Sequence, residues 1–171
     1  YEYICVLSIS LPLYLVLDAL SAAVTAFCPQ NYASGNNKRV LQFITLTASV
    51  GILYGIFCFL IHILFGKAYF GMLFDDPVII AYGVSYWFWQ GLGQPFVSMM
   101  YTLRFFLDAV GQSKLALLSG VGELIGNLLC AFWVIPSFGN IGASIAQPLG
   151  WMLGGMWLIS AFLYVRKKVL T

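Results

Sequence analysis

Five apolar blocks, each long enough to cross a bilayer, divide this chain of 171 residues and constrain its fold more than any other feature. A hydrocarbon core of about 30 Å needs on the order of 20 helical residues, because each residue adds about 1.5 Å of rise. Backbone groups in hydrocarbon must be paired within their own segment, and the blocks lack the two-residue alternation of barrel strands. We therefore expect helices at approximately 4–28, 40–66, 77–107, 114–135 and 141–165.

Composition indicates that lipid, not water, surrounds most of the chain. It is 61% hydrophobic and 8% charged, whereas soluble domains carry about 25% charged residues. The formal net charge of +2 is too small to indicate a nucleic-acid partner. The sequence thus predicts an all-α fold, a polytopic transmembrane helix bundle that forms a single domain over residues 1–171. Because the chain opens at Tyr1 inside an apolar block, we expect it to be a piece of a longer polypeptide.

Polar connections separate the blocks and set their orientation. We expect these connections at 31–39, 66–76, 111–114 and 136–140. If the connection at 31–39 is cytoplasmic, the alternation of crossings places Lys67 as the only cation outside, which agrees with the positive-inside rule. The cations placed inside are Lys38, Arg39, Arg104, Lys114, Arg166, Lys167 and Lys168. Asp75 and Asp76 fall outside, directly before Pro77, which is a favourable first helical residue.

Two carboxylates within the blocks are the first candidates for function. Asp18 lies well inside the first block, where an ionised side chain costs at least a few kcal/mol unless it meets a cavity or a partner. Because hydrocarbon disfavours the charged form, Asp18 is a candidate for binding a proton or a cation, and a structural carboxyl is the alternative. Glu123 can bond Asn127 one helical turn later, or tie to Arg104 or Lys114, and a role in transport stays open beside these structural ones.

Other polar residues have mainly structural interpretations. Arg104 and Asp108 are four residues apart, and we expect them to form an interfacial ion pair. We expect His62 to be a hydrogen-bonded ring near the outer end of its helix, with a proton sensor as the alternative. No metal-ligand spacing or catalytic arrangement is present, so we expect no metal site and no enzyme. The cysteines are isolated and predict packing roles: Cys5, Cys28, Cys58 and Cys130.

The third block is interrupted near its middle by the stretch "QGLGQP". Pro95 lacks a backbone donor and clashes with the carbonyl of Gly91, while Gly91 and Gly93 ease bending, so we expect a kink. The freed carbonyls, with Gln90 and Gln94, can line a polar cavity. A kink that only shapes the helix is the alternative.

Small residues predict that the helices approach one another closely. Three pairs of glycines have the small-xxx-small spacing that permits such contact. They are Gly51 and Gly55, Gly122 and Gly126, and Gly150 and Gly154.

The stretch "AVTAFCPQNYASGNNKRV" resembles the end of a second helix in the multidrug and toxic compound extrusion (MATE) family, where a pattern like Q-N-x-G-A-G-x-x-x-R recurs. The residues that fit, allowing for spacing, are Gln30, Asn31, Gly35 and Arg39, whereas Ala33 and Ser34 replace the usual Gly and Ala. Further similar stretches follow in order: "MYTLRFFLDAVGQSKLAL", "GVGELIGNLL" and "GNIGASIAQPLGWMLGG". The resemblance covers nearly the whole chain and favours the C-terminal half without its first helix, with the N-terminal half as the alternative.

The resemblance implies one lobe of a two-lobed, pseudo-symmetric transporter of twelve helices. Such a protein exports drugs or other organic compounds by alternating access, with H⁺ or Na⁺ as the coupling ion and no other cofactor. The implied partners are membrane lipids, a small organic substrate and the remaining half of the transporter. The implied location is the plasma membrane, as in a bacterial inner membrane.

One departure and two alternatives accompany this resemblance. Family members often carry an acid in the helix that corresponds to the third block, and residues 77–107 contain none, which weakens the case for Na⁺ coordination by this lobe. A lipid-linked oligosaccharide flippase of the same superfamily is one alternative, although such proteins place several cations in a central cavity. A non-transporting membrane scaffold is the other.

Overall fold

The structure, a computed structural model, describes the backbone of residues 2–168 and the side chains of residues 14–168. These residues are helical almost throughout, and no strand occurs among them, so the all-α prediction is confirmed. The elements are α1 (Glu2–Ala33), α2 (Asn37–Leu73), α3 (Pro77–Ala109), α4 (Ser113–Leu129), the π-helix η1 (Cys130–Val134), α5 (Ile135–Phe138) and α6 (Asn140–Lys168). The fourth expected block corresponds to the continuous run of α4, η1 and α5.

Three helical segments are long and apolar enough to cross a membrane: Asn37–Leu73, Ser113–Phe138 and Asn140–Lys168. The other two long helices, α1 and α3, were also expected to be crossings but are not among the segments that meet this criterion within the described residues. The position of α3 explains its lower hydropathy. It packs against α1, α2, α4 and α6, so neighbouring helices rather than lipid cover most of its surface.

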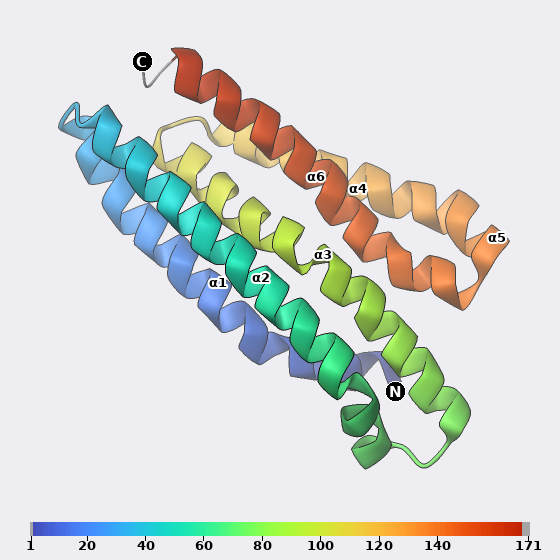
Figure 1. Ribbon diagram of the computed structural model, residues 1–171. Helices are drawn as coiled ribbons and strands as arrows, with labels where there is room; N and C mark the ends of the chain where they lie inside the picture. The colour runs from blue at the N-terminus through green and yellow to red at the C-terminus, as the bar shows by residue number, and fades with distance from the viewer. Residues whose placement is uncertain (1, 169–171) are drawn as a thin grey trace.

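The two ends of the bundle carry different charge. Figure 1 shows that the α1–α2 turn, the α3–α4 turn and the C-terminal end of α6 lie at one end, and that the α2–α3 turn and α5 lie at the other. We call the first the basic end, because it holds Lys38, Arg39, Lys114, Arg166, Lys167 and Lys168. Lys67, Asp75 and Asp76 lie toward the opposite end.

The connections are shorter than the sequence predicted, and the first, expected at 31–39, spans only residues 34–36. Residues 66–73 were expected to belong to a connection, but α2 continues to Leu73, and the Phe74 N–H bonds the Phe70 carbonyl. Phe70 is buried against Trp87 of α3, so packing extends the helix past the point where Gly66 and Lys67 indicate an end. The residues around Pro136 were likewise expected to be a connection, but they form α5, and only Gly139 separates α5 from α6. The start of α3 agrees with the prediction, because the Asp76 carboxylate accepts a hydrogen bond of 2.8 Å from the Val78 N–H beside Pro77.

Two glycines end helices in the same way. Gly35 has φ +72° and Gly111 has φ +76°, values in the left-handed region that favour glycine. After α1, the Gly35 and Asn36 N–H groups bond the carbonyls of Tyr32 and Asn31 at 3.0 and 2.8 Å. The turn after α3 has the same pair of bonds around Gly111. Both are Schellman motifs, which satisfy the last carbonyls of a helix and let the chain reverse.

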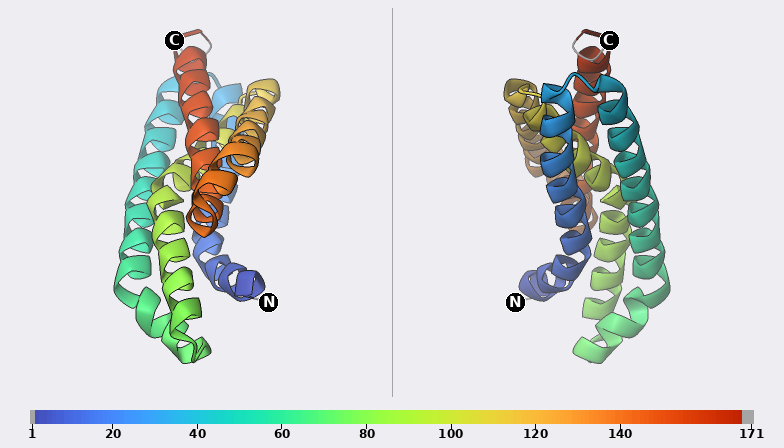
Figure 2. Two further views of the ribbon diagram at one scale, coloured as in Figure 1. Left: turned by 90° about the vertical axis from the view of Figure 1, so that its right-hand side faces the viewer. Right: turned by 90° about the vertical axis from the view of Figure 1, so that its left-hand side faces the viewer.

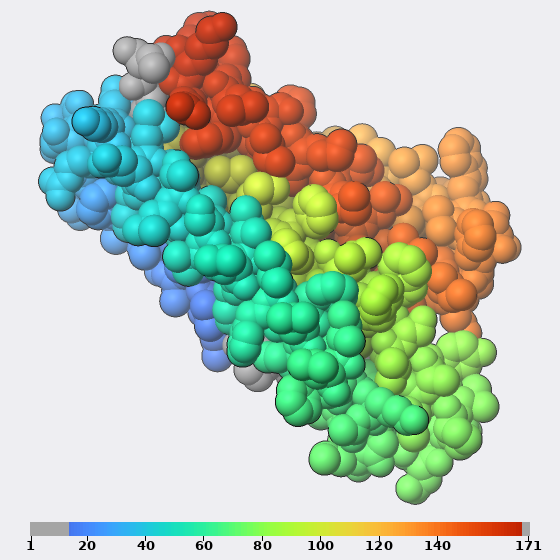
Figure 3. Space-filling model, viewed as in Figure 1, coloured from blue at the N-terminus to red at the C-terminus, as the bar shows by residue number. Residues whose placement is uncertain are grey.

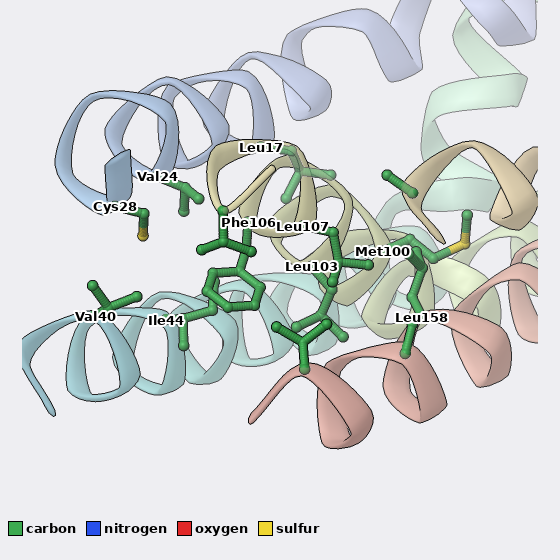
Figure 4. Close-up of a cluster of buried hydrophobic side chains, with 14 of the residues drawn as sticks. Leu17, Val24, Cys28, Val40, Ile44, Met100, Leu103, Phe106, Leu107 and Leu158 are labelled. Carbon is green, nitrogen blue, oxygen red and sulfur yellow. The ribbon is translucent and has the colours of Figure 1, made fainter. Parts of the chain in front are cut away.

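The main core lies where α1, α2, α3 and α6 meet. Figure 4 shows its side chains converging from these four helices, with Phe106 of α3 among residues of α1 and α2. Leu17, Val24, Ile44, Phe106 and Leu158 are each 1% exposed or less. This core holds together segments far apart in the sequence, so the described residues pack as one bundle.

The paired glycines lie at helix contacts, as the sequence predicted. A Cβ at Gly55 would lie 2.6 Å from the Pro95 Cα, and one at Gly126 would lie 2.8 Å from the Gly150 Cα. The α2–α3 and α4–α6 contacts therefore bring backbone against backbone. The cysteines Cys28, Cys58 and Cys130 are buried and free, whereas the side chain of Cys5 lies outside the described residues.

Candidate functional site

Polar side chains from α1, α3 and α4 share one neighbourhood in the bundle. The Tyr101 hydroxyl of α3 interacts electrostatically with Asp18 of α1, with Arg104 of α3 and with Glu123 of α4. Tyr101 and Arg104 lie one helical turn apart, and α1 and α4 both pack against α3. We call these four residues the polar face. It brings both carboxylate candidates of the sequence together with a cation.

An ion pair connects α3 and α4 within the polar face. The Arg104 Nη2 lies 2.9 Å from the Glu123 Oε2, and the two side chains are 35% and 28% exposed. The Arg104 Nε and Nη2 also donate to the Ser119 Oγ at 3.1 and 2.9 Å, and this hydroxyl donates to the Ala116 carbonyl at 2.6 Å. Ser119 therefore fixes the guanidinium where it meets Glu123.

This pair corrects the expectation that Arg104 pairs with Asp108. Arg104 is half-buried against α4, whereas Asp108 is exposed in the last turn of α3. A partner across the helix contact is less exposed to water than one on the outer surface, so the Arg104–Glu123 interaction is less screened. Among the two structural ties expected for Glu123, the one to Arg104 is present.

Among the described residues, the Asp18 side chain is exposed, and it lines an open groove of about 500 Å³. Ser21, Ala22, Thr25 and Ala26 of α1 and Phe105 of α3 form the rest of this groove. The two hydroxyls are already bonded to their own helix, Ser21 to the Leu17 carbonyl and Thr25 to the Ser21 carbonyl. Asp18 is therefore the acidic group that this groove presents, and a cation or a proton can reach it from outside the bundle.

Asn127 does not bond Glu123, although the i+4 spacing predicted that it can. Glu123 bonds Arg104 instead, and Asn127 lies at the contact between α4 and α6. A Cβ at Gly150 would lie 3.2 Å from the Asn127 Oδ1. The absence of a side chain at Gly150 thus makes room for the Asn127 amide.

Gln90 and Gln94 lie in the interior of the bundle, one turn apart on α3. Gln94 is 3% exposed, and its side chain makes a hydrogen bond with Tyr14 of α1. Gln90 is 8% exposed, and its Nε2 has no partner among the described residues. Buried donors are nearly always paired, so Gln90 is the amide with capacity for another acceptor.

The expected hinge residues are tightly packed. A Cβ at Gly91 would lie 2.9 Å from the Phe59 ring of α2, and one at Gly93 would lie 2.6 Å from the Trp151 ring of α6. Pro95 lies against Gly55, and α3 remains helical through it. Figure 2 shows that the ribbon of α3 changes direction between its lime N-terminal half and its olive C-terminal half. The glycines thus let α2 and α6 approach the middle of α3.

The family-motif residues build the α1–α2 turn. The Asn31 Nδ2 donates to the Phe27 carbonyl at 2.9 Å, and the Arg39 guanidinium lies 5.9 Å from the centre of the Phe27 ring. The Gln30 carbonyl accepts a hydrogen bond from the Ser34 hydroxyl at 2.8 Å, and Gly35 supplies the left-handed residue. These contacts give Gln30, Asn31, Gly35 and Arg39 a structural role at the basic end.

His62 is less accessible than the sequence predicted. It is 2% exposed, its Nδ1 lies 2.7 Å from the Cys58 carbonyl, and its ring meets Trp87 edge-on with centroids 4.7 Å apart. The ring is hydrogen-bonded as expected, but it is enclosed between α2 and α3 because α2 extends well beyond it.

A second hollow lies toward the opposite end from the basic residues. Figure 3 shows a strip of α3 between α2 and α6. There, aromatic residues line a cavity of about 200 Å³ together with Asn140 and Ser144 of α6. The aromatic lining is Phe70, Phe74, Tyr82 and Tyr86.

Sequence reasoning missed Ser119, Tyr101 and Tyr14 as parts of the polar network. Spacing offered a signal for two of them, because Ser119 lies four residues before Glu123 and Tyr101 three residues before Arg104, which places each on the same helical face. Tyr14 reaches Gln94 from another helix, so no local pattern indicates it.

Comparisons with known proteins give one result. The family model described as MatE matches residues 3–133. Neither a curated protein nor a solved structure matches the chain.

Proposed function

This chain belongs to the MatE family of membrane transporters, and from that premise we propose that it forms most of one lobe of a cation-coupled exporter. In this proposal the full transporter moves drugs or other organic compounds outward across the plasma membrane in exchange for H⁺ or Na⁺. The remaining half of the transporter completes the pathway, and the two lobes alternate access to a site between them.

The position of Asp18 is the observation that carries the proposal. Its carboxylate is exposed in a groove of the lobe and interacts electrostatically with Tyr101, which also interacts with Arg104 and Glu123. An intramembrane carboxylate that faced lipid would be strongly unfavourable, and such groups face water or a partner segment instead. These features support a place for the polar face in the proposed transport pathway.

The same geometry supports a mechanism of ion coupling. Asp18 can take up a proton or a cation from the open groove, which changes its electrostatic interaction with Tyr101. A coupling ion shifts a conformational equilibrium only if it binds one state better than the other, so the groove must open to different sides in the two states. Glu123 is an acid held by Arg104, and a cationic substrate can compete with this guanidinium for it.

The flippase alternative requires several cations that meet a pyrophosphate in a central cavity. Arg104 is the cation of the polar face, and Glu123 already pairs with it. The other described cations lie toward the ends of the helices. This distribution favours export of an organic compound over translocation of a lipid-linked sugar.

The test uses the full-length protein in proteoliposomes with an imposed H⁺ or Na⁺ gradient. We expect the gradient to drive movement of a fluorescent organic cation, and Asp18→Asn to abolish it while insertion into the membrane remains normal. Asp108→Asn is the matched control, because it neutralises an exposed acid of α3 outside the polar face and should leave transport unchanged. Gradient-driven transport that survives in Asp18→Asn would remove Asp18 from the coupling mechanism. A full-length protein that moves no substrate under either gradient would favour a scaffold.

A further inference from the structure

A groove distinct from both hollows described above lies between α4 and α6, away from the polar face. It encloses about 450 Å³ and is lined mainly by apolar residues. These apolar residues are Leu118, Val121 and Ile125 of α4 and Leu153, Met156 and Trp157 of α6. Gly122 lies at its floor, where the two helices are in contact, since a Cβ at Gly122 would lie 3.4 Å from the Gly154 Cα. We call it the α4–α6 groove.

The α4 side of this groove points away from Glu123. An α-helix turns by about 100° per residue, so Leu118, Val121 and Ile125 lie about 140–160° around the axis from Glu123. These three residues and Met156 are between 44% and 55% exposed. An apolar groove on this side of a membrane helix is a suitable environment for an acyl chain, whereas the polar face is not.

Cations stand beyond one end of the α4–α6 groove. Lys114 precedes Leu118 by one helical turn on α4 and is exposed. The Trp157 indole N–H donates to the Leu115 carbonyl at 2.9 Å and joins the start of α4 to α6. Farther along α6, the Lys168 Nζ donates to the Tyr164 hydroxyl at 3.0 Å and lies 5.4 Å from the centre of its ring.

The order of these groups along the helices matches a phospholipid. Apolar side chains come first, then an indole N–H at the level of Leu115, and then ammonium groups at the basic end of the bundle (Figure 1). Trp and Tyr are enriched at the boundary between lipid and water, and each Lys or Arg near an anionic membrane surface contributes about 1 kcal/mol of attraction. The concentration of cations at this end favours an anionic headgroup over a zwitterionic one.

We propose that the α4–α6 groove binds an acyl chain of an anionic phospholipid whose phosphate is held by Lys114, with Lys168 as a second cation nearer the water. The lipid then bridges α4 and α6 at the basic end and stabilises their contact. This site does not depend on the transport activity proposed above, because the polar face takes no part in it.

The first experiment measures the heat-unfolding midpoint of the purified full-length protein in detergent. Ligands that bind the folded state raise this midpoint. We expect phosphatidylglycerol to raise it by several degrees more than phosphatidylcholine with the same chains. The Lys114→Gln/Lys168→Gln double variant should lose at least half of that difference. The control is Lys67→Gln, which removes a cation toward the opposite end of the bundle and should retain the full difference.

Three results would overturn the proposal. One is an equal shift with phosphatidylcholine, another is the same shift with inorganic phosphate alone, and the third is a double variant that keeps the whole phosphatidylglycerol effect. Inorganic phosphate distinguishes a simple anion site from a lipid site. No arm requires substrate movement, so failure of this inference and failure of the proposed exporter are separate outcomes.

A second pair of variants tests the groove itself. Val121→Trp places a large side chain in the α4–α6 groove and should reduce the phosphatidylglycerol effect while the midpoint without lipid stays near that of the unmodified protein. Leu60→Trp, at an exposed apolar position of α2, is the matched control and should leave the effect intact. If Val121→Trp lowers the midpoint without lipid, the Leu118→Ser variant is used instead, and its binding of spin-labelled phosphatidylglycerol is measured. Binding equal to that of the unmodified protein would count against the groove.

Discussion

The Arg104 guanidinium of α3 and the Glu123 carboxylate of α4 lie 2.9 Å apart, and the Ser119 hydroxyl accepts two further hydrogen bonds from Arg104. Nineteen positions of sequence separate the two charges. The pair therefore links α4 to α3, and both of its charges interact electrostatically with Tyr101, as Asp18 does.

A double-mutant cycle between Arg104→Gln and Glu123→Gln should give a coupling free energy of about 1 kcal/mol. The two side chains are 35% and 28% exposed, so solvent screening keeps the value near that of a surface pair. The measurement is the unfolding free energy of the full-length protein in one detergent.

The matched cycle pairs Arg104→Gln with Asp108→Asn and should give a coupling of at most about 0.5 kcal/mol, as for an exposed pair one turn apart on a helix. A larger coupling to Asp108 than to Glu123 would contradict the observed arrangement.

Helix contacts at small residues give a second prediction. A Cβ at Gly126 would lie 2.8 Å from the Gly150 Cα, so Gly126→Ala must push the α4 and α6 backbones apart. We expect it to destabilise the protein by about 1–3 kcal/mol, as overpacking does. The control is Gly120→Ala on the same helix, which meets nothing within 4 Å and should be neutral or slightly stabilising. Equal unfolding midpoints for the two variants would show that the α4–α6 contact is looser than described.

The turn after α1 gives a third prediction. Gly35 has φ +72°, and alanine in this region costs about 1–2 kcal/mol. Gly35→Ala should therefore lower the unfolding free energy by about 1 kcal/mol, because only the local backbone is strained. Gly35→Asn should have a smaller effect, since asparagine tolerates the left-handed conformation. Gly71→Ala, at a helical glycine of α2 with nothing within 4 Å, serves as the control. If all three variants are equally stable, Gly35 does not hold the turn.

The sequence predicts the helices and their order because long, mainly apolar blocks alternate with short turns that contain a glycine or a polar residue. The end of α2 could not be read in this way. Gly66 and Lys67 are typical of a helix end, but a Cβ at Gly66 would lie 3.6 Å from the Trp87 ring, so this glycine serves a helix contact. Local spacing does not distinguish the two uses.

The sequence indicates which residues of the polar face are functional candidates, but not which of them pair with one another. Asp18 and Glu123 stand out because charges are rare in apolar helices. The partner of Arg104 depends on how α4 lies against α3, and Asp108 has the better local spacing. The position of α4 follows from its close contact with α6 at Gly122 and Gly126, which is long-range information. The hydrogen bond between Tyr14 of α1 and Gln94 of α3 likewise depends on how two helices pack, which local spacing does not show.

The middle of α3 gives the last prediction, which concerns the rate of transport. Pro95 lies against Gly55 of α2, and Gly93 lies against Trp151 and Pro148 of α6, so a bend of α3 here moves it relative to both neighbours. Pro95→Ala restores a backbone donor and removes the ring that clashes with the preceding turn, which stiffens the helix. If the proposed exporter bends at this point, Pro95→Ala should slow gradient-driven transport severalfold in proteoliposomes while the unfolding midpoint stays the same or rises.

The control for this prediction is Pro77→Ala, at the first position of α3, where proline replaces no needed donor. It should leave transport unchanged. A normal transport rate in Pro95→Ala would mean that the proline only shapes α3. A slow rate together with a lowered midpoint would assign the effect to a weakened fold, because a hinge defect changes the rate of conformational exchange without weakening the fold.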